Sequence, residues 1–143
     1  MEKLILDFLV HVRKEEVSRV ETPIGAASII PFDAETESSL FSGRTLPGAA
    51  DVQITNAAGI RHMRACYMFE GKDFTGSACR LFICNEGFFE PKSRPRPFHA
   101  CPTFLTDSAA LAPLLHRACF RAEGQSEDDG LHIRVFHVMD AEG

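Results

Sequence analysis

Apolar and polar residues alternate with a period of two along much of this chain. In residues 4–12 every even-numbered position is apolar, and the odd-numbered positions include charged and polar side chains. Successive side chains of a β-strand point to opposite faces, so this pattern predicts a strand with one buried face. Residues 60–70, 77–85 and 131–139 also have the composition of long strands. The pattern therefore predicts a protein built mainly of β-strands.

Turn-forming residues divide the chain into eight to ten expected strands. The clearest part is residues 43–85, where Pro47-Gly48 and the glycine-containing segments 56–59 and 71–76 separate strand-like runs. Such segments are typical of tight turns and hairpin connections. Shorter strands are expected at residues 17–20, 40–46, 51–55, 101–105 and 114–122.

Other segments are expected to interrupt the strands. Pro31 lies inside the β-prone residues 26–32 and predicts an edge strand or a bend there. The only expected helix is residues 109–112, which Pro113 can cut short. Polar, acidic or proline-rich composition predicts loops at residues 33–38, 86–97 and 123–130. The proline-rich part, residues 91–97, is either a lid or a plain connection.

The order of the expected elements indicates an all-β fold in a single domain. No strand–helix–strand alternation is visible, so a parallel sheet is not expected, and an antiparallel barrel or a sandwich remains. A chain of 143 residues fits one domain, residues 1–143, and a hydrophobic content of 45% is enough for a proper core.

Charge, hydropathy and cysteine content exclude several classes of protein. The formal net charge is −5, whereas nucleic acids and anionic membranes attract basic surfaces. No apolar run approaches the roughly 18 residues that span a bilayer, and the first residues do not resemble a secretion signal. The five cysteines are odd in number and lack CxxC spacing, which favours reduced thiols. We therefore expect a cytoplasmic protein that binds neither nucleic acid nor membranes.

Both faces of the strand expected at residues 60–70 mix charged and large apolar side chains. One face holds His62, Arg64, Cys66, Met68 and Glu70, and the other holds Arg61, Met63, Ala65, Tyr67 and Phe69. Two interpretations remain open. The first is a packed core under a polar outer surface. The second is a barrel with a partly polar interior that holds one small ligand.

Each candidate ligand-binding residue also has a structural interpretation. Asp51 follows a Pro-Gly turn, where it would either bond turn backbone or place a carboxylate at the mouth of a barrel. Tyr67, the single tyrosine, would anchor its hydroxyl to backbone or contact a ligand. Arg64 and Arg80 would either pair with Glu70 across the hairpin or bind a ligand carboxylate.

Several stretches resemble the family catalogued as domain of unknown function 3237. GRTLPGAADVQ is similar to its L-P-G-G element, and RACYMFEGKDFTGSACRLFICNEG is similar to the strand, D-x-x-G hairpin and apolar strand that follow. PTFLTDS and GLHIRVFHV are similar to its later strands, so the resemblance covers most of the chain. It implies a small calycin-like β-barrel with no established catalytic residue and no established cofactor.

Individual positions both match this family pattern and depart from it. The matching residues are Asp51, Gln53, Tyr67 and Asn85. The differing residues are Ala49, Cys66, His99 and Leu105. The differing positions are among those that would carry any chemistry shared by the family. Their replacement therefore argues against transferring such chemistry to this chain.

No cofactor and no metal site are expected. His132 and His137 are five residues apart, which places them on opposite faces of one strand. His99 and Cys101 are close in sequence but supply only two ligands, whereas a zinc site takes three or four from the protein. Motifs for a phosphate-binding loop, a nucleophilic serine or a zinc-dependent hydrolase do not occur.

Three functional hypotheses follow from the sequence. The first is a barrel that binds a small apolar or aromatic carboxylate in its interior, with or without transforming it, so enzymatic activity stays open. Its ligand-binding residues would be Asp51, Gln53, Arg64, Tyr67, Glu70, Arg80 and Asn85. The second is a homo-oligomeric structural or interaction protein without a ligand pocket, in which many of the twelve phenylalanines serve an interface. The third is redox sensing through Cys66 or Cys101.

Overall fold

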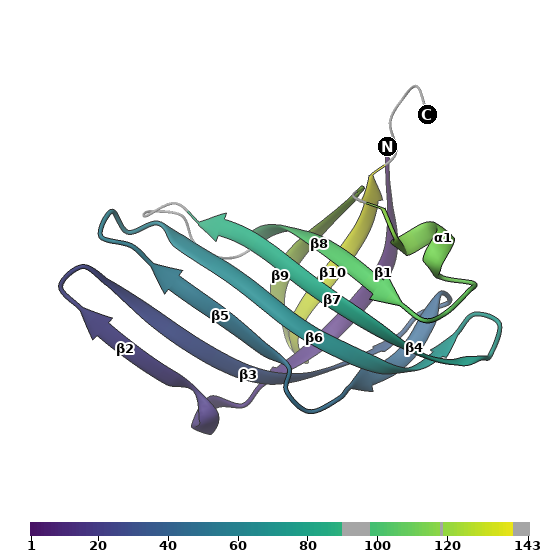
Figure 1. Cartoon of the computed structure of the whole chain (residues 1–143), viewed down its shortest axis with the longest axis horizontal. Helices are drawn as coiled ribbons and strands as arrows, with labels where there is room; N and C mark the ends of the chain where they lie inside the picture. The colour runs from purple at the N-terminus through teal and green to yellow at the C-terminus, as the bar shows by residue number, and fades with distance from the viewer. Residues whose placement is uncertain (90–97, 118, 139–143) are drawn as a thin grey trace.

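The chain folds into an antiparallel β-barrel (Figure 1). The computed structural model describes residues 1–89, 98–117 and 119–138. Within these residues there are ten strands, and the prediction of an all-β antiparallel barrel with at most one short helix is confirmed. The strands are β1 (Glu2–Val12), β2 (Ser18–Thr22), β3 (Gly25–Glu37), β4 (Phe41–Thr45), β5 (Ala50–Thr55), β6 (Arg61–Asp73), β7 (Ala78–Phe89), β8 (Phe98–Thr106), β9 (Phe120–Glu127) and β10 (Gly130–Val138). The helical segments are the 3-10 turn η1 (Lys14–Glu16) and the α-helix α1 (Ala112–Leu115).

Strand β1 closes the barrel because it pairs on both of its edges. On one edge it runs antiparallel to β10, with Phe8 opposite Ile133 and Val10 opposite Leu131. On the other edge its last residues pair with β3, where Val12 lies opposite Phe32. From β10 the sheet continues through β9, β8, β7 and β6. The closed sheet creates an interior that every second side chain of each strand faces.

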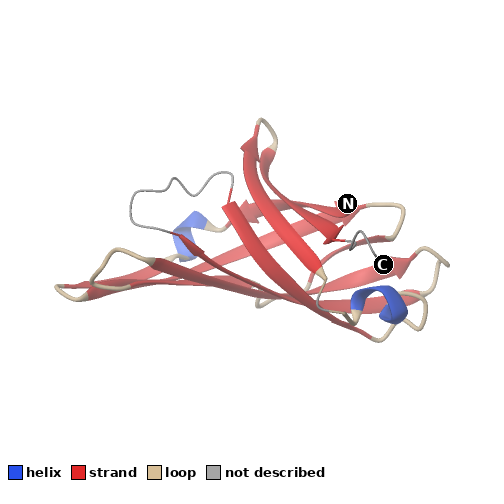
Figure 2. Ribbon diagram, turned by 90° about the horizontal axis from the view of Figure 1, so that it is seen from above, coloured by secondary structure: helices blue, strands red, loops and turns tan. Residues whose placement is uncertain are grey.

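Eight strand positions make up the wall, because β4 and β5 share one of them. Both lie between β3 and β6, with β4 beside one half of these long strands and β5 beside the other. Strand β2 continues along β3 where β1 ends, and pairs with Gly25–Ile29. Strands β2, β3, β5 and β6 therefore form a sheet that reaches beyond the curled part of the barrel (Figures 1 and 2).

Two glycines allow β4 and β6 to approach closely. Gly43 lies directly opposite Gly71 in this pair of strands. A Cβ atom at Gly43 would lie 2.5 Å from the carbonyl oxygen of Glu70, and one at Gly71 would collide with the carbonyl oxygen of Ser42. The glycine that begins the GRTLPG stretch is therefore required by backbone contact between strands.

Strand β3 runs unbroken from Gly25 to Glu37, so the loop expected at 33–38 was wrong. Of the two alternatives for residues 26–32, an edge strand or a bend, the structure has a strand and no bend. The carbonyl oxygen of Pro31 accepts a hydrogen bond from the Arg13 backbone, just past the end of β1. The missing N–H of Pro31 faces the same side, where β1 no longer offers a ladder partner. In residues 32–37 the side chains of Phe32, Ala34 and Thr36 are buried, while acidic residues alternate with them on the outer face. The alternation of apolar and polar residues there indicated a strand, but the prediction followed the acidic composition, which is typical of a loop.

The elements after residue 106 also differ from the expectation. The helix lies at Ala112–Leu115 rather than at 109–112, and the expected strand 114–122 begins only at Phe120. Leu111 and Leu115, four residues apart, are both fully buried, which is the spacing of one helical turn. Pro113 lies in the first turn, where a missing N–H leaves no hydrogen bond unmade.

Acidic side chains also concealed the true length of two hairpin strands. The loop expected at 123–130 is mostly strand, because β9 continues to Glu127 and only 128–129 turn. Glu127 pairs with Arg134 of β10 on the outer face at 2.5 Å. Of the loop expected at 86–97, residues 86–89 belong to β7. The remainder, including the proline-rich residues 91–97, lies outside the described residues.

Aromatic side chains fill the middle of the barrel. Phe8 and Phe69 are fully buried with ring centroids 4.9 Å apart, and Tyr67 meets Phe8 edge-on at 6.2 Å and Phe32 at 5.2 Å. Leu115 of α1 joins the same core. Because α1 packs beside β8 at one end, the core occupies that end and the middle, and the opposite end is left less filled.

A buried aspartate ties α1 to the β6–β7 turn. The Ser108 hydroxyl donates to Asp73 at 2.6 Å, and the backbone N–H groups of Thr75 and Ser77 donate to the same carboxylate. Ser108 in turn accepts a hydrogen bond from the backbone of Leu111. These contacts hold the short helix over the end of the barrel.

Candidate functional site

The less filled end of the barrel contains a cavity of about 280 Å³. This volume is close to the lower end of the range found for small-molecule sites. Its polar lining consists of Asp51, Gln53, Arg61, Tyr67 and Asn85. Its apolar lining consists of Val10, Val12, Ile30, Phe32, Met63, Ala65, Phe89, Leu131 and Ile133.

Strand register explains why the polar residues converge on one space. Ala65, on the inner face of β6, lies opposite Asp51 of β5 on one side and opposite Asn85 of β7 on the other. Gln53 follows Asp51 by two residues and therefore faces the same interior. Arg61 lies on the same face of β6 as Ala65, two residues before Met63.

Three buried polar atoms in this lining have no hydrogen-bond partner among the described residues. They are Oδ1 of Asp51, Oδ1 of Asn85 and Nε of Arg61. The other oxygen of Asp51, Oδ2, accepts a hydrogen bond from Gln53 at 2.8 Å. An unpaired buried polar atom costs about 1–3 kcal/mol, and most native structures contain few of them. Three such atoms in one lining leave hydrogen-bonding capacity there that no described protein group uses.

The cavity also changes the acid–base properties of two side chains. Burial raises the pKa of the Asp51 carboxyl, and the Gln53 hydrogen bond and the nearby charges of Arg61 and His62 oppose this rise. Burial raises the pKa of Tyr67 as well, and the neighbouring Asp51 charge adds to the effect. Tyr67 therefore stays a neutral phenol, 5% exposed, which can donate a hydrogen bond into the cavity.

Arg61 is the charged group of the cavity with the least protein pairing. Its guanidinium carbon lies 4.6 Å from the centroid of the Phe89 ring, a cation–π contact. Within the described part of the chain, Arg61 makes no ion pair with a carboxylate. Although Arg61 forms no ion pair with Asp51, its positive charge opposes the rise that burial causes in the pKa of Asp51. The guanidinium is thus held in place by an aromatic ring and remains available to an anion.

The structure brings four of the seven sequence candidates to the cavity, namely Asp51, Gln53, Tyr67 and Asn85. It does not bring Arg64, Glu70 or Arg80 there. Arg80 and Glu70 lie opposite each other and form an exposed ion pair at 3.0 Å, which is the structural alternative. Arg64 lies on the same outer face, 3.6 Å from Glu86 and 3.4 Å from the Cys84 sulfur.

Sequence reasoning overlooked Arg61 as a ligand-binding residue. The signal was available, because Arg61 has the same parity as Tyr67 and Met63. The prediction instead took Arg64 as the cationic residue of β6. Arg64 lies on the opposite face of this strand, which is the outer face of the closed barrel. Arg64 fits that face because it has the acidic Glu86 as a neighbour.

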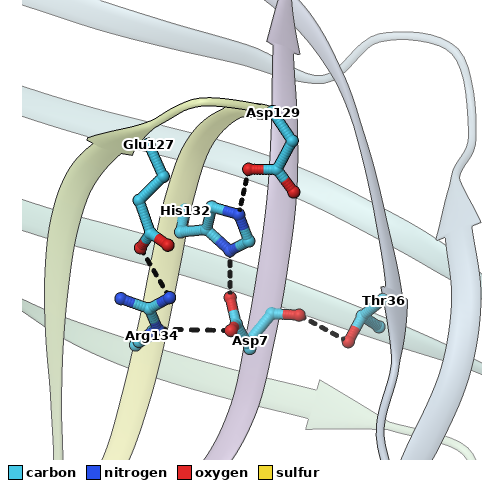
Figure 3. Close-up of polar contacts among 6 residues, drawn as sticks. All are labelled: Asp7, Thr36, Glu127, Asp129, His132 and Arg134. Carbon is cyan, nitrogen blue, oxygen red and sulfur yellow. Dashed lines mark hydrogen bonds and ion pairs between the residues drawn. The ribbon is translucent and has the colours of Figure 1, made fainter.

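A second polar cluster lies on the outside, where β1 meets β10 (Figure 3). One ring nitrogen of His132 is 2.8 Å from Asp7 and the other is 2.7 Å from Asp129. Arg134 donates to the second oxygen of Asp7 at 3.2 Å. Both ring nitrogens are engaged, so this cluster is an ion network that joins the two strands. No group of three or more metal-ligating side chains suited to an ion is found in the residues that the structure describes.

Comparison with known proteins shows the fold. No family model matches the chain, and no curated protein matches it, so membership of the domain of unknown function 3237 family stays a prediction. The chain is similar to a solved protein of unknown function from Clostridium acetobutylicum, with a TM-score of 0.77, 18% identity, and 97% of this chain and 99% of that chain covered.

Two further solved structures share the architecture. A conserved protein of unknown function from Rhodopseudomonas palustris gives a TM-score of 0.75 and 22% identity, with 97% of each chain covered. A beta-barrel like protein from Acinetobacter baumannii gives a TM-score of 0.70 and 15% identity, with 96% of each chain covered. Among the described residues, no helix has the length and apolar character needed to cross a membrane. The chain is therefore a small β-barrel whose structural neighbours include proteins of unknown function.

Proposed function

We propose that this barrel binds a small apolar or aromatic carboxylate in its cavity. The observation that carries the proposal is Arg61, whose buried Nε–H lacks a hydrogen-bond partner among the described residues while its guanidinium lines an apolar space. A guanidinium offers parallel N–H groups that match a carboxylate, and the pair is strong where water is reduced. The ligand carboxylate would pair with the Arg61 guanidinium, with which no carboxylate of the described residues forms an ion pair.

The remaining lining supports an apolar or aromatic body for this ligand. Nine of the cavity residues are apolar, and Phe32 and Phe89 present aromatic rings. Small-molecule sites are typically apolar with a few polar groups that fix orientation. A volume of about 280 Å³ suits a molecule with one ring better than a lipid or a polycyclic compound.

The proposal is tested by ligand-induced stabilisation. Benzoate, phenylacetate and cinnamate are each compared with their uncharged amides by thermal unfolding and by calorimetry. The acids should raise the melting temperature and the amides should not, since a ligand that binds the folded state stabilises it by mass action. Loss of this difference between acid and amide would contradict the proposal.

A matched pair of variants locates the binding. Arg61→Met removes the cavity guanidinium, and Arg64→Met removes one from the outer face of the same strand. We expect Arg61→Met to weaken acid binding by at least about tenfold, or about 1.4 kcal/mol, and Arg64→Met to leave it unchanged. Equal effects of the two substitutions would place the acid elsewhere. The mass of each bound acid, measured after prolonged incubation, distinguishes binding alone from catalysis. An unchanged mass indicates a carrier, and a changed mass indicates an enzyme.

Self-association is a second candidate, and it is supported by an apolar stripe on the outer face of the extended sheet. Val20, Ala27, Ile54, His62 and Phe88 lie in one row across β2, β3, β5, β6 and β7. Val20, Ile54 and Phe88 are each more than half exposed. Contiguous exposed apolar patches commonly mark protein interfaces. In the described residues β2 pairs with β3 alone, so the row ends at a strand edge.

The sequence of β2 suits pairing with a second copy of itself. An antiparallel pair centred on Val20 would set Arg19 against Glu21 of the other copy and continue the apolar stripe across the joint. Light scattering after size exclusion should give a dimer mass for the wild-type protein and a monomer mass for Arg19→Glu. The double exchange Arg19→Glu with Glu21→Arg should restore the dimer, and a monomeric wild-type protein would end this candidate.

A further inference from the structure

Two hydrogen-bond acceptors lie on either side of Ala65 inside the cavity. Asp51 and Asn85 are its cross-strand neighbours on β5 and β7. Adjacent strands are about 4.8 Å apart, so the backbones of Asp51 and Asn85 are roughly 10 Å apart. Only the methyl group of Ala65 lies in the row between them. This row therefore has space for a ligand group flanked by a carboxylate and an amide.

Each of the two acceptors has an oxygen without a partner. Oδ1 of Asp51 and Oδ1 of Asn85 are buried and accept no hydrogen bond from any described residue. Gln53 occupies the other oxygen of Asp51 and so fixes the orientation of its carboxyl group. Asn85 is only 2% exposed, which keeps its side chain away from bulk water. Two orphaned acceptors at one place call for a donor, and no donor of the described chain supplies it.

The cation of the cavity lies at some distance from this row. Arg61 precedes Ala65 by four residues on the same face of β6, which separates the two backbones by roughly 13 Å. Met63 lies between them and presents an apolar surface. The long side chain of Arg61 spans part of this distance. A molecule that contacts both places would have an acid at one end, a hydrogen-bond donor at the other and a flat apolar body between.

We propose that the ligand of this cavity is a hydroxyaryl carboxylic acid, whose hydroxyl shares its one hydrogen between Asp51 and Asn85 in a bifurcated hydrogen bond while its carboxylate binds Arg61. This inference rests on the proposed function and adds the donor group at the far end of the acid. A site that hydrogen-bonds a ligand hydroxyl rejects the analogue without one, because its own buried acceptors are then left unpaired. The two oxygens would thus determine which acids are selected.

The test compares three ligands of nearly equal shape on the wild-type protein. Cinnamate, 4-methylcinnamate and 4-hydroxycinnamate share the acid and the ring, and the methyl and hydroxyl groups have similar size. Calorimetry should show 4-hydroxycinnamate binding about 10–100-fold more tightly than 4-methylcinnamate, the range expected for hydrogen bonds to a charged acceptor. Equal affinities, which would mean that water satisfies the two oxygens, would overturn the inference.

Substitution of one acceptor assigns the preference to this row. Asn85→Leu keeps the side-chain size and removes the acceptor, so the preference for 4-hydroxycinnamate over 4-methylcinnamate should fall at least tenfold. Gln53→Leu is a second variant, which releases the Asp51 carboxyl without altering the row itself and serves if Asn85→Leu does not fold. A preference that survives both substitutions would overturn the assignment.

The experiment separates failure of this inference from failure of the proposed function. If all three acids bind and none is preferred, the carboxylate site stands and the donor site is refuted. If no acid stabilises the protein, the proposed function fails, and the inference fails with it. Only tight and selective binding of the hydroxy acid supports both.

Discussion

Gln53 donates a hydrogen bond to Oδ2 of Asp51, over 2.8 Å, from two residues further along β5. Both side chains point to the interior because they share one parity of the same strand. The bond fixes the carboxyl group and leaves its second oxygen buried, with no hydrogen-bond partner among the described residues. The charge of Asp51 is thus held at a place where burial disfavours it.

Replacement of Asp51 by Asn should stabilise the empty protein. Burial raises the folded-state pKa of Asp51 above its ordinary value of 3.8, so its ionised form costs stability at neutral pH. This cost is absent below pH 3.8 and develops as the pH rises through the folded-state pKa. The melting temperature of Asp51→Asn should therefore exceed that of the wild type at neutral pH, with the difference vanishing in acid. An equal difference at all pH values would contradict the assignment.

Asp73 should have the opposite effect on stability. Hydrogen bonds from Ser108, then Thr75, lower its pKa from 3.8 to about 2. A carboxyl whose pKa is depressed by folding contributes stability above pH 3.8, and this contribution is lost as the pH falls towards 2. In chemical denaturation, the wild-type protein should lose more stability than Asp73→Asn over that interval. Parallel pH profiles for the two proteins would refute the role given to Asp73.

His132 should stabilise the closure of the barrel below neutral pH. Hydrogen bonds that its ring donates, first to Asp7 and then to Asp129, raise its pKa above 6.5. Its contribution is fully present below pH 6.5 and is lost as the pH rises through the folded-state value. The free energy of unfolding of the wild type should therefore decline with rising pH more steeply than that of His132→Gln. His137→Gln is the control, because the His137 ring packs against Phe120, with ring centroids 5.5 Å apart, and not against Asp7 or Asp129.

Truncation of Leu115 in α1 should destabilise the protein far more than truncation of Leu105 in β8. Leu115 is fully buried, whereas Leu105 is 63% exposed. Leu115→Ala should lower the free energy of unfolding by about 2–5 kcal/mol, because it removes apolar contacts and leaves a cavity under the helix. Leu105→Ala should change it by less than about 0.5 kcal/mol. Similar losses in urea denaturation would show that α1 does not close this end of the core.

Cys66 and Cys84 should form a disulfide under mild oxidation. They are cross-strand neighbours on β6 and β7, and their sulfur atoms lie 3.6 Å apart. Burial raises the pKa of the Cys66 thiol, so the reaction should accelerate in alkaline solution. Oxidised glutathione would accept the two electrons, and intact-mass spectrometry with peptide mapping should show loss of two hydrogen atoms at this pair. Cys84→Ser is the control, and unchanged free thiols in the wild type would contradict the prediction.

Local sequence predicted the face of most residues on the long strands and failed where composition and pattern disagreed. The alternation in β1 and β6 is independent of the rest of the chain, because side-chain direction in a strand follows from backbone geometry alone. In residues 33–38 and 123–130 the acidic side chains suggested loops. The outer face of a closed sheet tolerates such side chains, and Arg134 and Arg13 neutralise two of them.

The all-β character, the turns and the two faces of β6 could be predicted from local sequence, since each depends on neighbours within a few residues. Which face became the interior could not be predicted in this way. That choice depends on β1 pairing with both β10 and β3, contacts between residues far apart in the chain. The same long-range register set Asp51 and Asn85 on either side of Ala65. It also placed Arg61 on the inner face and Arg64 on the outer face. Residues of opposite parity on one strand point to opposite faces, and only one of these faces the interior of a closed barrel.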